Sequence, residues 1–562
     1  MEINSRFSKY LITLLIILLN SNVNSQILFT QIPIDNQLVG RNKISNTGKV
    51  QIVGFAENSI ISYDSLLIEV HRNEPIYENK IQALDYSLNI ADFDFEFNIP
   101  AELANYSFHI FGILGEERTL VKTINNIVAG DTYIIQGQSN AEAPMVQGSA
   151  NNYRDDFIRV YASGTHFKDS LPEDNNWYVG QGDGYRTSRG NTGQWGLKLA
   201  KMLIDSINIP IAIFNGAHGG KDINFYQCPE DYQTTLTSNY SRLYYRLNKS
   251  GLKDFVRAVL WSQGEWDGEN YSNTALEEYK NLFNNLTEDW YRDYPNIEEI
   301  YIFQTKNGCG GFLHNIKEAQ RQLAADNNNI SIMSTAALAH FQDHCHFPFL
   351  DGYEIFANRI FPLVTRDLYN INTNNEVDAP MITYANLVND LTLIVGTDSE
   401  ELSITNIAED FYLSSNTLSE ITNIQISNEK IVFSLSEHPG QYSTISYLAQ
   451  DSGVGNFITN SKNLELICFY NYPIIETSSN NEIIHYKPII YPNPTNDLIK
   501  VKLPYFVANN EITLFDIYGK IIFNRFESKN EIMINLPEID GMYILELKDE
   551  YGNISRHKII KR

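Results

Sequence analysis

Residues 132–140, Thr-Tyr-Ile-Ile-Gln-Gly-Gln-Ser-Asn, begin as an apolar run and end in a glycine, a serine and an asparagine. The apolar run is typical of a buried strand, and the residues after it are typical of a turn. A serine at the carboxyl end of a strand can expose its hydroxyl beside backbone N–H groups, so Ser139 is a candidate nucleophile. The same residues also fit a plain turn, because Ser and Asn both cap and turn the chain well.

Five more apolar runs follow this one, with amphipathic stretches between them. The spacing of Trp195, Leu199 and Leu203 matches the period of a helix. Strands that alternate with helices predict a parallel sheet covered by helices on both faces, which holds ligands at the carboxyl ends of its strands. We expect strands at 132–135, 157–161, 209–214, 256–261, 300–303 and 330–333, and helices at 194–206, 275–291, 313–325 and 352–368.

The chain on either side of this middle part reads as β-structure. Short alternating segments such as 50–55, 66–70 and 93–97 are punctuated by Asn, Gly, Asp and Pro, which is typical of an antiparallel β-sandwich. The predicted fold is therefore multidomain α/β plus all-β, with a central three-layer α/β/α domain. Short strands are predicted again at 391–395, 430–435, 443–448 and 464–468. The predicted parts of the chain are an N-terminal β-sandwich (26–130), the α/β domain (131–370), a second β-sandwich (371–475), a linker (476–486) and a small C-terminal β domain (487–562).

Composition narrows the classes of function. The 562 residues contain 42 Lys and Arg against 68 Asp and Glu, a net charge of −26. So acidic a chain repels phosphate backbones, which excludes nucleic acid as a partner. Four cysteines are too few for a disulfide-framed small domain; Cys228 and Cys309 could pair, but the sequence does not assign connectivity.

Residues 1–25 have the order of a secretory signal peptide. Arg6 and Lys9 precede an apolar run over 10–19, and Ser25 offers a small residue before Gln26. The run is short of the about 20 residues that a membrane span needs, so a retained N-terminal anchor is only the alternative. We expect a mature protein with no transmembrane span, outside the cytoplasm, where disulfides are permitted.

A second candidate group lies just before the last predicted helix of the α/β domain. Asp343 can accept the Nδ1 proton of His346 and leave Nε2 free as a general base towards a serine. The stretch is also rich in metal-ligand types, among them His340, His344 and Cys345. Because ligand spacings typical of a metal site and a matching Cys/His pair elsewhere are missing, we expect no metal and no other cofactor.

Two loops that follow predicted strands could stabilise an oxyanion. One contains Gly219 and Gly220, where backbone N–H groups can point at a substrate oxygen. The other contains Gln263, whose side-chain amide can donate to the same oxygen. Either loop alone is equally well explained as a tight turn. Their position at strand ends, together with the serine and the Asp/His group, favours an active site.

These motifs together resemble those of the SGNH (GDSL-like) hydrolases, and within them the sialate O-acetylesterase and acetylxylan esterase branch. The resemblance covers residues 131–370 and implies an SGNH-type domain. It implies a catalytic triad with Ser139 as nucleophile, Asp343 and His346. It implies an oxyanion hole formed by Gly220, alternatively Gly219, together with Gln263. Asn140 and Glu265 are possible supporting residues. The chain departs from the family in having Gln-Gly-Glu-Trp-Asp where most SGNH enzymes have an Asn, and Ala141 where a Met is common.

The C-terminal part also resembles a known family. Tyr491-Pro492-Asn493-Pro494, the stretch 514–520 and Gly541-Met542-Tyr543 are similar to the type A sorting domain of type IX secretion in Bacteroidetes. The resemblance implies export through the outer membrane by that machinery, and a secreted or cell-surface location. An ordinary β module, such as a carbohydrate-binding one, is the alternative.

The two resemblances together imply a secreted serine esterase that removes O-acetyl groups from carbohydrate, through an acetyl-enzyme intermediate. The alternative is a non-catalytic glycan-binding protein or adhesin that keeps an esterase-like domain, since β-sandwiches flank the domain and aromatic residues are abundant. An acidic chain fits neutral acetylated sugars better than anionic ones. For sialic acid, residues such as Lys221 or Arg186 would have to meet the negative charge.

Overall fold

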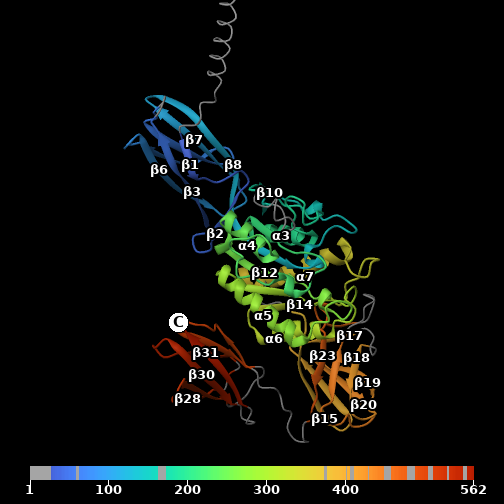
Figure 1. Cartoon of the computed structure of the whole chain (residues 1–562). Coiled ribbons are helices and arrows are strands. Elements are labelled where there is room, and N and C mark those ends of the chain that lie inside the picture. The colour runs from blue at the N-terminus through green and yellow to red at the C-terminus, as the bar shows by residue number, and fades with distance from the viewer. Residues whose placement is uncertain are drawn as a thin grey trace, which may run out of the picture. The chain divides into compact units, whose positions relative to one another are not determined.

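The computed structural model describes residues 27–58, 62–162, 173–371, 376–399, 401–404, 410–427, 429–448, 457–476, 488–503, 510–527, 529, 531–548 and 554–562. The expected signal peptide and most of the expected linker lie outside these residues. The chain forms two compact units (Figure 1). The first comprises Met1–Met381, Glu401–Phe411 and Ser446–Tyr470, and the second comprises Ile382–Glu400, Tyr412–Ile445 and Asn471–Arg562.

The N-terminal part consists of two antiparallel sheets around one core. In β6 (Ile90–Pro100) the residues Phe93, Phe95 and Phe97 are buried and alternate with exposed acidic residues, so the alternation predicted there is confirmed. The first sheet contains β1 (Ile27–Gln31), β2 (Leu38–Asn42), β3 (Thr47–Glu57) and β6. The second contains β4 (Ser65–Arg72), β5 (Ile76–Ala83), β7 (Tyr106–Leu114) and the first part of β8 (Glu117–Gly137).

Strand β8 passes from this sandwich into the central sheet. Its first part pairs antiparallel with β7, and its last residues pair in parallel with two other strands. The boundary expected at residue 130 therefore falls inside one continuous strand. The six strands predicted for the α/β domain are all present. The order across the sheet is β10 (Trp177–Val179), β9 (Ile158–Tyr161), β11 (Ile211–Asn215), β8, β12 (Val256–Ser262), β13 (Glu299–Phe303) and β14 (Ile330–Met333), all parallel except β10.

Helices cover both faces of this sheet. Because strand residues alternate, Tyr133 and Ile135 pack on one face, while Ile134 packs on the other. The mixed α/β core and the four predicted helices are confirmed, and one helix, α4, was not predicted. The first face carries α3 (Gln194–Ile207) and α7 (Glu354–Tyr369); the second carries α4 (Asn239–Ser250), α5 (Leu276–Asp293) and α6 (His314–Asp326).

The strand predicted at 464–468 is absent. Cys468 instead exchanges two hydrogen bonds of 2.9 Å with the side-chain amide of Gln304, and Ile467 is buried in the core beneath α5 and α6. Leu464 and Leu466 exchange backbone hydrogen bonds with Asn460 and Ile458, but this contact is a single β-bridge at Glu465, and at Cys468 a side chain takes the place of a neighbouring strand. The strands of this part are β15 (Ile382–Asn389), β16 (Thr392–Thr397), β17 (Leu402–Ile404), β18 (Phe411–Ser414), β19 (Ile421–Ser427), β20 (Lys430–Leu435), β21 (Thr444–Tyr447), β22 (Ile458–Asn460), β23 (Phe469–Pro473) and β24 (Ile475–Glu476).

The C-terminal part is a small β-sandwich with its own core. Ile499 and Val501 from one sheet and Leu514 and Leu545 from the other are buried together. One sheet contains β25 (Ile489–Tyr491), β26 (Leu498–Lys502) and β29 (Glu531–Asn535); the other contains β27 (Asn510–Asp516), β28 (Ile521–Glu527), β30 (Gly541–Lys548) and β31 (Ile554–Lys561).

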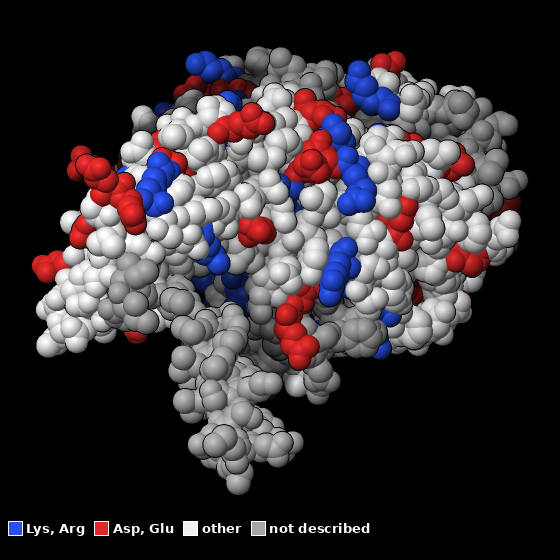
Figure 2. Space-filling view, turned by 90° about the horizontal axis from the view of Figure 1, so that it is seen from above, with Lys and Arg blue, Asp and Glu red and all other residues white. Residues whose placement is uncertain are grey.

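Two properties of the surface bear on the expected partners. Within the described residues, no helix is both long enough and apolar enough to cross a membrane. Figure 2 shows acidic and basic side chains scattered over one face, with no basic patch gathered there, in a chain whose net charge is −26. That face offers no footprint for a phosphate backbone.

Candidate active site

Ser139 lies where three neighbouring strands of the sheet end together. It is the first residue of the short helix α2 (Ser139–Glu142), directly after β8. The N–H of Gln138 donates to the carbonyl of Ser262 at the end of β12, at 3.0 Å. The two chains can approach this closely because residue 137 is glycine: a Cβ on Gly137 would lie 2.1 Å from the Ser262 carbonyl oxygen.

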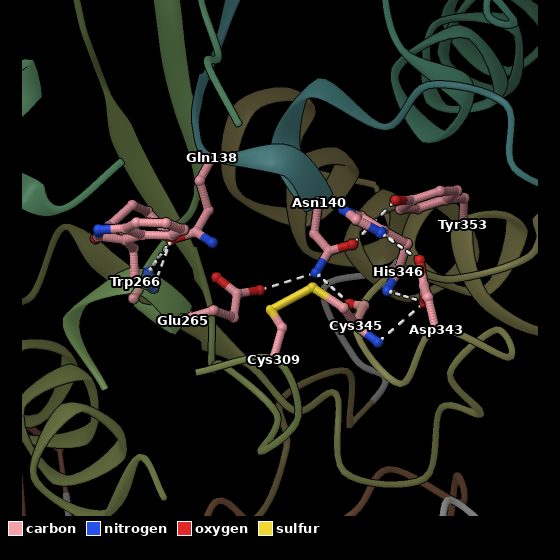
Figure 3. Close-up of a disulfide and its surroundings, with 11 residues drawn as sticks. Gln138, Asn140, Glu265, Trp266, Cys309, Asp343, Cys345, His346 and Tyr353 are labelled. Carbon is pink, nitrogen blue, oxygen red and sulfur yellow. Dashed lines mark hydrogen bonds and ion pairs between the residues drawn. A yellow bond between two sulfur atoms is a disulfide. The ribbon is translucent and has the colours of Figure 1, made fainter. Parts of the chain in front are cut away.

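Asp343 and His346 form the pair that their spacing predicted. The Asp343 Oδ2 lies 2.6 Å from Nδ1 of His346, while its Oδ1 accepts backbone N–H groups of Cys345 and His346, both at 3.0 Å (Figure 3). Partial burial works to raise the pKa of Asp343, but these N–H groups and the His346 ring outweigh it, so the pKa lies below its ordinary value. The carboxylate therefore fixes the imidazole and leaves Nε2 as the ring nitrogen directed elsewhere.

Asn140 joins the serine loop to the histidine loop. Its Nδ2 donates to the Cys345 carbonyl at 3.1 Å and to Glu265 Oε1 at 2.8 Å, and its Oδ1 accepts from the Tyr353 hydroxyl at 2.9 Å (Figure 3). Because Asn140 follows Ser139 and Cys345 precedes His346, these bonds hold the candidate nucleophile and the candidate base on adjacent loops. The sequence singled out Asn140 as a supporting residue without showing what it supports.

Glu265 lies beneath Asn140 and is almost fully buried. Its Oε1 accepts from Asn140, and its Oε2 has no hydrogen-bond partner among the described residues. Burial raises the pKa of Glu265, while the hydrogen bond from Asn140 and the nearby His346 act in the opposite direction. Glu265 contacts the loop-joining amide rather than the imidazole, which is the arrangement of a support for Asn140.

A disulfide joins the histidine loop to the loop after β13. The sequence offered Cys228 and Cys309 as a pair; the structure instead bonds Cys309 to Cys345, and Cys228 and Cys468 are free. The sequence missed this bond because Cys345 lies among metal-ligand types and the two cysteines are 36 residues apart. Over the residues that the structure describes, no group of three or more His, Cys, Asp or Glu side chains could hold a metal ion.

The two glycines proposed for the oxyanion hole differ in what they contact. The N–H of Gly219 donates to Glu142 Oε2 at 3.2 Å, and a Cβ on Gly219 would lie 3.3 Å from the Ser139 Cβ. Gly220 has a φ of +66°, and its N–H meets no hydrogen-bond acceptor in the described part of the chain. The loop therefore packs against Ser139. The Gly219 N–H already donates a hydrogen bond, and the Gly220 N–H is available for another acceptor.

Glu142 is a buried residue of this site that sequence reasoning missed. Besides the Gly219 N–H, its carboxylate accepts the backbone N–H of Arg186 at 3.0 Å and Arg186 Nη1 at 2.7 Å. An acidic residue three positions after Ser139, in an otherwise small and apolar turn, was the available signal. Arg186, which we considered for binding a charged sugar, is therefore already paired, and the Lys221 ammonium lies 5.2 Å from the Phe225 ring centroid.

The Gln263 side chain is fully buried and engaged on both sides of its amide. Nε2 donates to the Lys221 carbonyl at 3.2 Å and to the Asp267 carboxylate, and Oε1 accepts from the Tyr279 hydroxyl at 3.1 Å. These contacts fix Lys221, the residue directly after Gly220. The direct donor role expected of Gln263 stays a prediction, since its N–H groups already have acceptors here.

Comparison with known families agrees with this geometry. Residues 129–350 match the family model described as carbohydrate esterase, sialic acid-specific acetylesterase. The chain carries a carbohydrate esterase domain. Residues 489–562 match the model of a secretion system C-terminal sorting domain, so both resemblances predicted from the motifs are confirmed. The chain thus combines a region similar to carbohydrate esterases with a C-terminal domain of the kind that directs secretion.

One solved structure supports the fold. The crystal structure of XAC1771, a carbohydrate acetylesterase from Xanthomonas citri, aligns with a TM-score of 0.57 at 16% identity, covering 79% of this chain and 99% of that chain. A protein from Arabidopsis thaliana aligns at 18% identity over 43% of this chain and 99% of its own, with a TM-score of 0.33. No curated protein sequence matches the chain.

Proposed function

We propose that the protein is a serine esterase of the SGNH type that removes O-acetyl groups from carbohydrate. The observation that carries the proposal is the Asp343–His346 pair, which Asn140 ties to the loop of Ser139. The domain limits expected from the sequence belong to the same proposal, with the esterase at 131–370. The family match supports an acetylesterase, and sialic acid is one candidate carrier of the acetyl group.

The first step is attack of Ser139 on the acetyl carbonyl. Nε2 of His346 takes the hydroxyl proton, while Asp343 holds the ring and stabilises the imidazolium that forms. The N–H groups of Ser139 and Gly220 bind the tetrahedral oxyanion, and Gln263 is the predicted third donor. The sugar alkoxide then leaves with the proton from His346, and the acetyl group stays on Ser139 as an ester.

The second step is hydrolysis of the acetyl-enzyme. His346 removes a proton from a water molecule, which attacks the same carbonyl carbon, and the oxyanion donors act again. The Ser139–acetyl bond breaks, the serine regains its proton from the imidazolium, and acetate leaves. All groups in this sequence are side chains or backbone of this chain, so the proposal requires no cofactor.

The test is acetate release from p-nitrophenyl acetate and from a panel of acetylated glycans. We expect Ser139→Ala to lower kcat by at least about 10³-fold, as loss of a triad member does. Ser45→Ala, in an exposed turn of the N-terminal sandwich, is the matched control and should act like the wild type. Equal release by Ser139→Ala and wild type would remove the triad assignment.

The non-catalytic alternative has a distinct outcome in the same experiment. Binding of a glycan without release of acetate from any member of the panel would favour a glycan-binding protein or adhesin. The proposed route of export is the type IX machinery, which the sorting domain supports, after removal of the signal peptide at 1–25. Mass spectrometry of the mature N-terminus tests that cleavage, and a chain that still begins at residue 1 would contradict it.

A further inference from the structure

We propose that the stacked side chains of Trp266 and Tyr271 form the platform on which the sugar ring of the substrate lies. This inference rests on the proposed esterase function and specifies how the site takes a pyranose. The resemblance gave no role to either residue: Trp266 directly follows Gln263-Gly264-Glu265, and Tyr271 lies in the loop after it.

The two rings lie face to face beside the candidate oxyanion donor. Their centroids are 3.9 Å apart and their planes differ by 7°. A Cβ on Gly220 would lie 3.5 Å from Cζ3 of Trp266, so the indole touches the glycine loop. Tyr271 keeps 45% of its surface exposed although Trp266 covers one face of its ring. The pair therefore places an apolar surface next to the point where the acetyl group would bind.

The loop that carries the pair is held by hydrogen bonds rather than left open. The Trp266 N–H donates to Gln138 Oε1 at 3.2 Å, beside the nucleophile, and the Trp266 carbonyl accepts the Ser272 N–H at 3.1 Å. The Ser272 hydroxyl donates to Asp222 Oδ2 at 3.4 Å, which ties the loop to the glycine loop. Figure 3 shows Gln138 and Trp266 close together with this contact drawn. A platform fixed in advance costs little ordering entropy when a ligand binds.

A pyranose is the ligand class that suits this surface. One face of the ring presents C–H groups, which lose contact with water when they lie on an aromatic ring, while the hydroxyls at the rim stay hydrated. An ester oxygen joins the acetyl group directly to that ring. In the proposed arrangement the acetylated edge of the sugar faces the loop of Gly220, which the Trp266 indole touches. Binding pockets for small ligands commonly combine such apolar walls with a few placed polar groups.

The experiment compares kcat/KM on a glycan with kcat/KM on a ring-free ester. Acetylated xylo-oligosaccharides, O-acetylated sialyllactose and cellobiose octaacetate are the glycan probes, and the best of them for the wild type is used. Ethyl acetate is the reference, because the ring of a nitrophenyl ester could itself stack on Tyr271. We expect Tyr271→Ala to lower the glycan-to-ethyl acetate ratio about tenfold, mainly through KM, and Tyr271→Phe to restore it. Tyr412→Ala is the control, since Tyr412 is 53% exposed and lies outside the site.

Two outcomes would overturn the platform. One is an unchanged ratio in Tyr271→Ala, and the other is an equal loss on both substrates that Tyr271→Phe does not restore. Calorimetric binding of the same glycans to Ser139→Ala separates this proposal from the proposed function. If the wild type hydrolyses no ester, the esterase assignment fails, and the platform then stands only if Tyr271→Ala weakens glycan binding about tenfold.

Discussion

At the scale of single residues, Glu142 is a buried carboxylate that contacts the loop of the proposed oxyanion donors. It spans three chain segments: its own helix after Ser139, the Arg186 turn and the Gly219 loop. With the Gly219 N–H turned to Glu142, the neighbouring Gly220 N–H is the one left for substrate. In the proposed site, this buried carboxylate therefore leaves Gly220 rather than Gly219 as the donor.

Removal of Glu142 should affect both stability and catalysis. Glu142→Ala removes the Glu142 carboxylate from the Arg186 guanidinium, whose side chain is 13% exposed, and from the Gly219 N–H. We expect a loss of about 3–5 kcal/mol in the free energy of unfolding and a fall in kcat with little change in KM. Denaturant melts and steady-state kinetics measure the two effects.

The conservative variant separates the two roles of Glu142. Glu142→Gln keeps an oxygen for the Gly219 N–H but lacks the charge for Arg186, so kcat should recover more fully than stability does. Equal kcat in Glu142→Ala and wild type would show that the carboxylate does not position the loop. The mutants must be compared at a temperature where both are folded, since an unfolded fraction would mimic a loss of kcat.

Glu299 gives a pH dependence of stability with a definite sign. Burial raises the pKa of this carboxyl to about 8, against 4.5 for an ordinary Glu, and the Ser331 hydroxyl donates to it at 2.8 Å. Between pH 4.5 and 8 the folded state therefore holds a proton that the unfolded state releases, so stability falls as the pH rises through this window.

Glu299→Gln should remove most of that slope. We expect the variant to gain on the order of a few kcal/mol over wild type at pH 8 and little at pH 4.5, as chemical denaturation at both pH values would show. Glu277→Gln, at a side chain that is 74% exposed, is the matched control and should leave the slope unchanged. The same pH dependence of stability in Glu299→Gln and wild type would mean that Glu299 is charged in the folded state.

At the scale of elements, the Cys309–Cys345 bond fixes the loop that carries Asp343 and His346. Cys345 is next to His346, and its carbonyl accepts from Asn140. The covalent link to Cys309 and the Asn140 bond thus restrain the loop from two directions. The free cysteines have no such position: Cys228 and Cys468 lie outside this loop.

Loss of the disulfide should lower kcat without unfolding the domain. A link across 36 residues is worth about 2–4 kcal/mol, which a large domain can lose and stay folded. We expect Cys309→Ser/Cys345→Ser, or wild type under reductant, to lose kcat at least about tenfold, because small displacements of a base are costly. Cys228→Ser is the control and should respond to reductant as wild type does. An unchanged kcat in the double variant would show that the Asn140 hydrogen bond alone is enough to hold the loop of Asp343 and His346.

The elements themselves were predictable where the apolar pattern was strong. Six of the seven strands of the central sheet were predicted because they are buried apolar runs, whereas the short antiparallel edge strand β10 was not predicted. The helices α3, α5, α6 and α7 were predicted as well. Helix α4 was not visible, since its sequence Asn-Tyr-Ser-Arg-Leu-Tyr-Tyr-Arg-Leu-Asn-Lys-Ser is mostly polar and Arg246 is buried against backbone carbonyls. Residues 464–468 were wrongly predicted as a strand because they are mostly apolar, but their pairing with a neighbouring strand is one β-bridge at Glu465, and Cys468 bonds to the Gln304 side chain.

The site was predictable only as far as its motifs reached. Asp343 and His346 are three residues apart, so their contact follows from local geometry. The roles of Asn140, Glu142 and Gln263 depend on partners 40 to 200 residues away in the chain, such as Lys221 and Cys345. Such pairings are decided by the packing of loops at the sheet edge and have no signature in sequence spacing.

At the scale of the whole molecule, the N-terminal sandwich and the α/β domain are physically continuous. Strand β8 belongs to both, and Asp131 within it is 2% exposed and accepts from Arg41 of β2, Arg257 of β12 and Tyr369 of α7, at 2.7 to 3.0 Å. Burial would raise the pKa of Asp131, but the two guanidinium groups and the Tyr369 hydroxyl lower it below its ordinary value. Because a buried charge cluster fails as a whole when one partner leaves, the two parts should unfold together.

Tryptophan fluorescence can test this coupling, because all five tryptophans lie between residues 177 and 290 and none lies in the N-terminal sandwich. Phe97→Ala removes a fully buried ring from the sandwich core and should cost about 3–5 kcal/mol. If the parts unfold as one, the free energy of unfolding that fluorescence reports falls by that amount, and the midpoint moves to a lower guanidinium concentration. Ile512→Ala, in the separate core of the C-terminal sandwich, should leave the midpoint in place. A fluorescence midpoint that is the same in Phe97→Ala and wild type would show that the sandwich unfolds independently. β8 and Asp131 would then not couple the stability of the sandwich to that of the α/β domain.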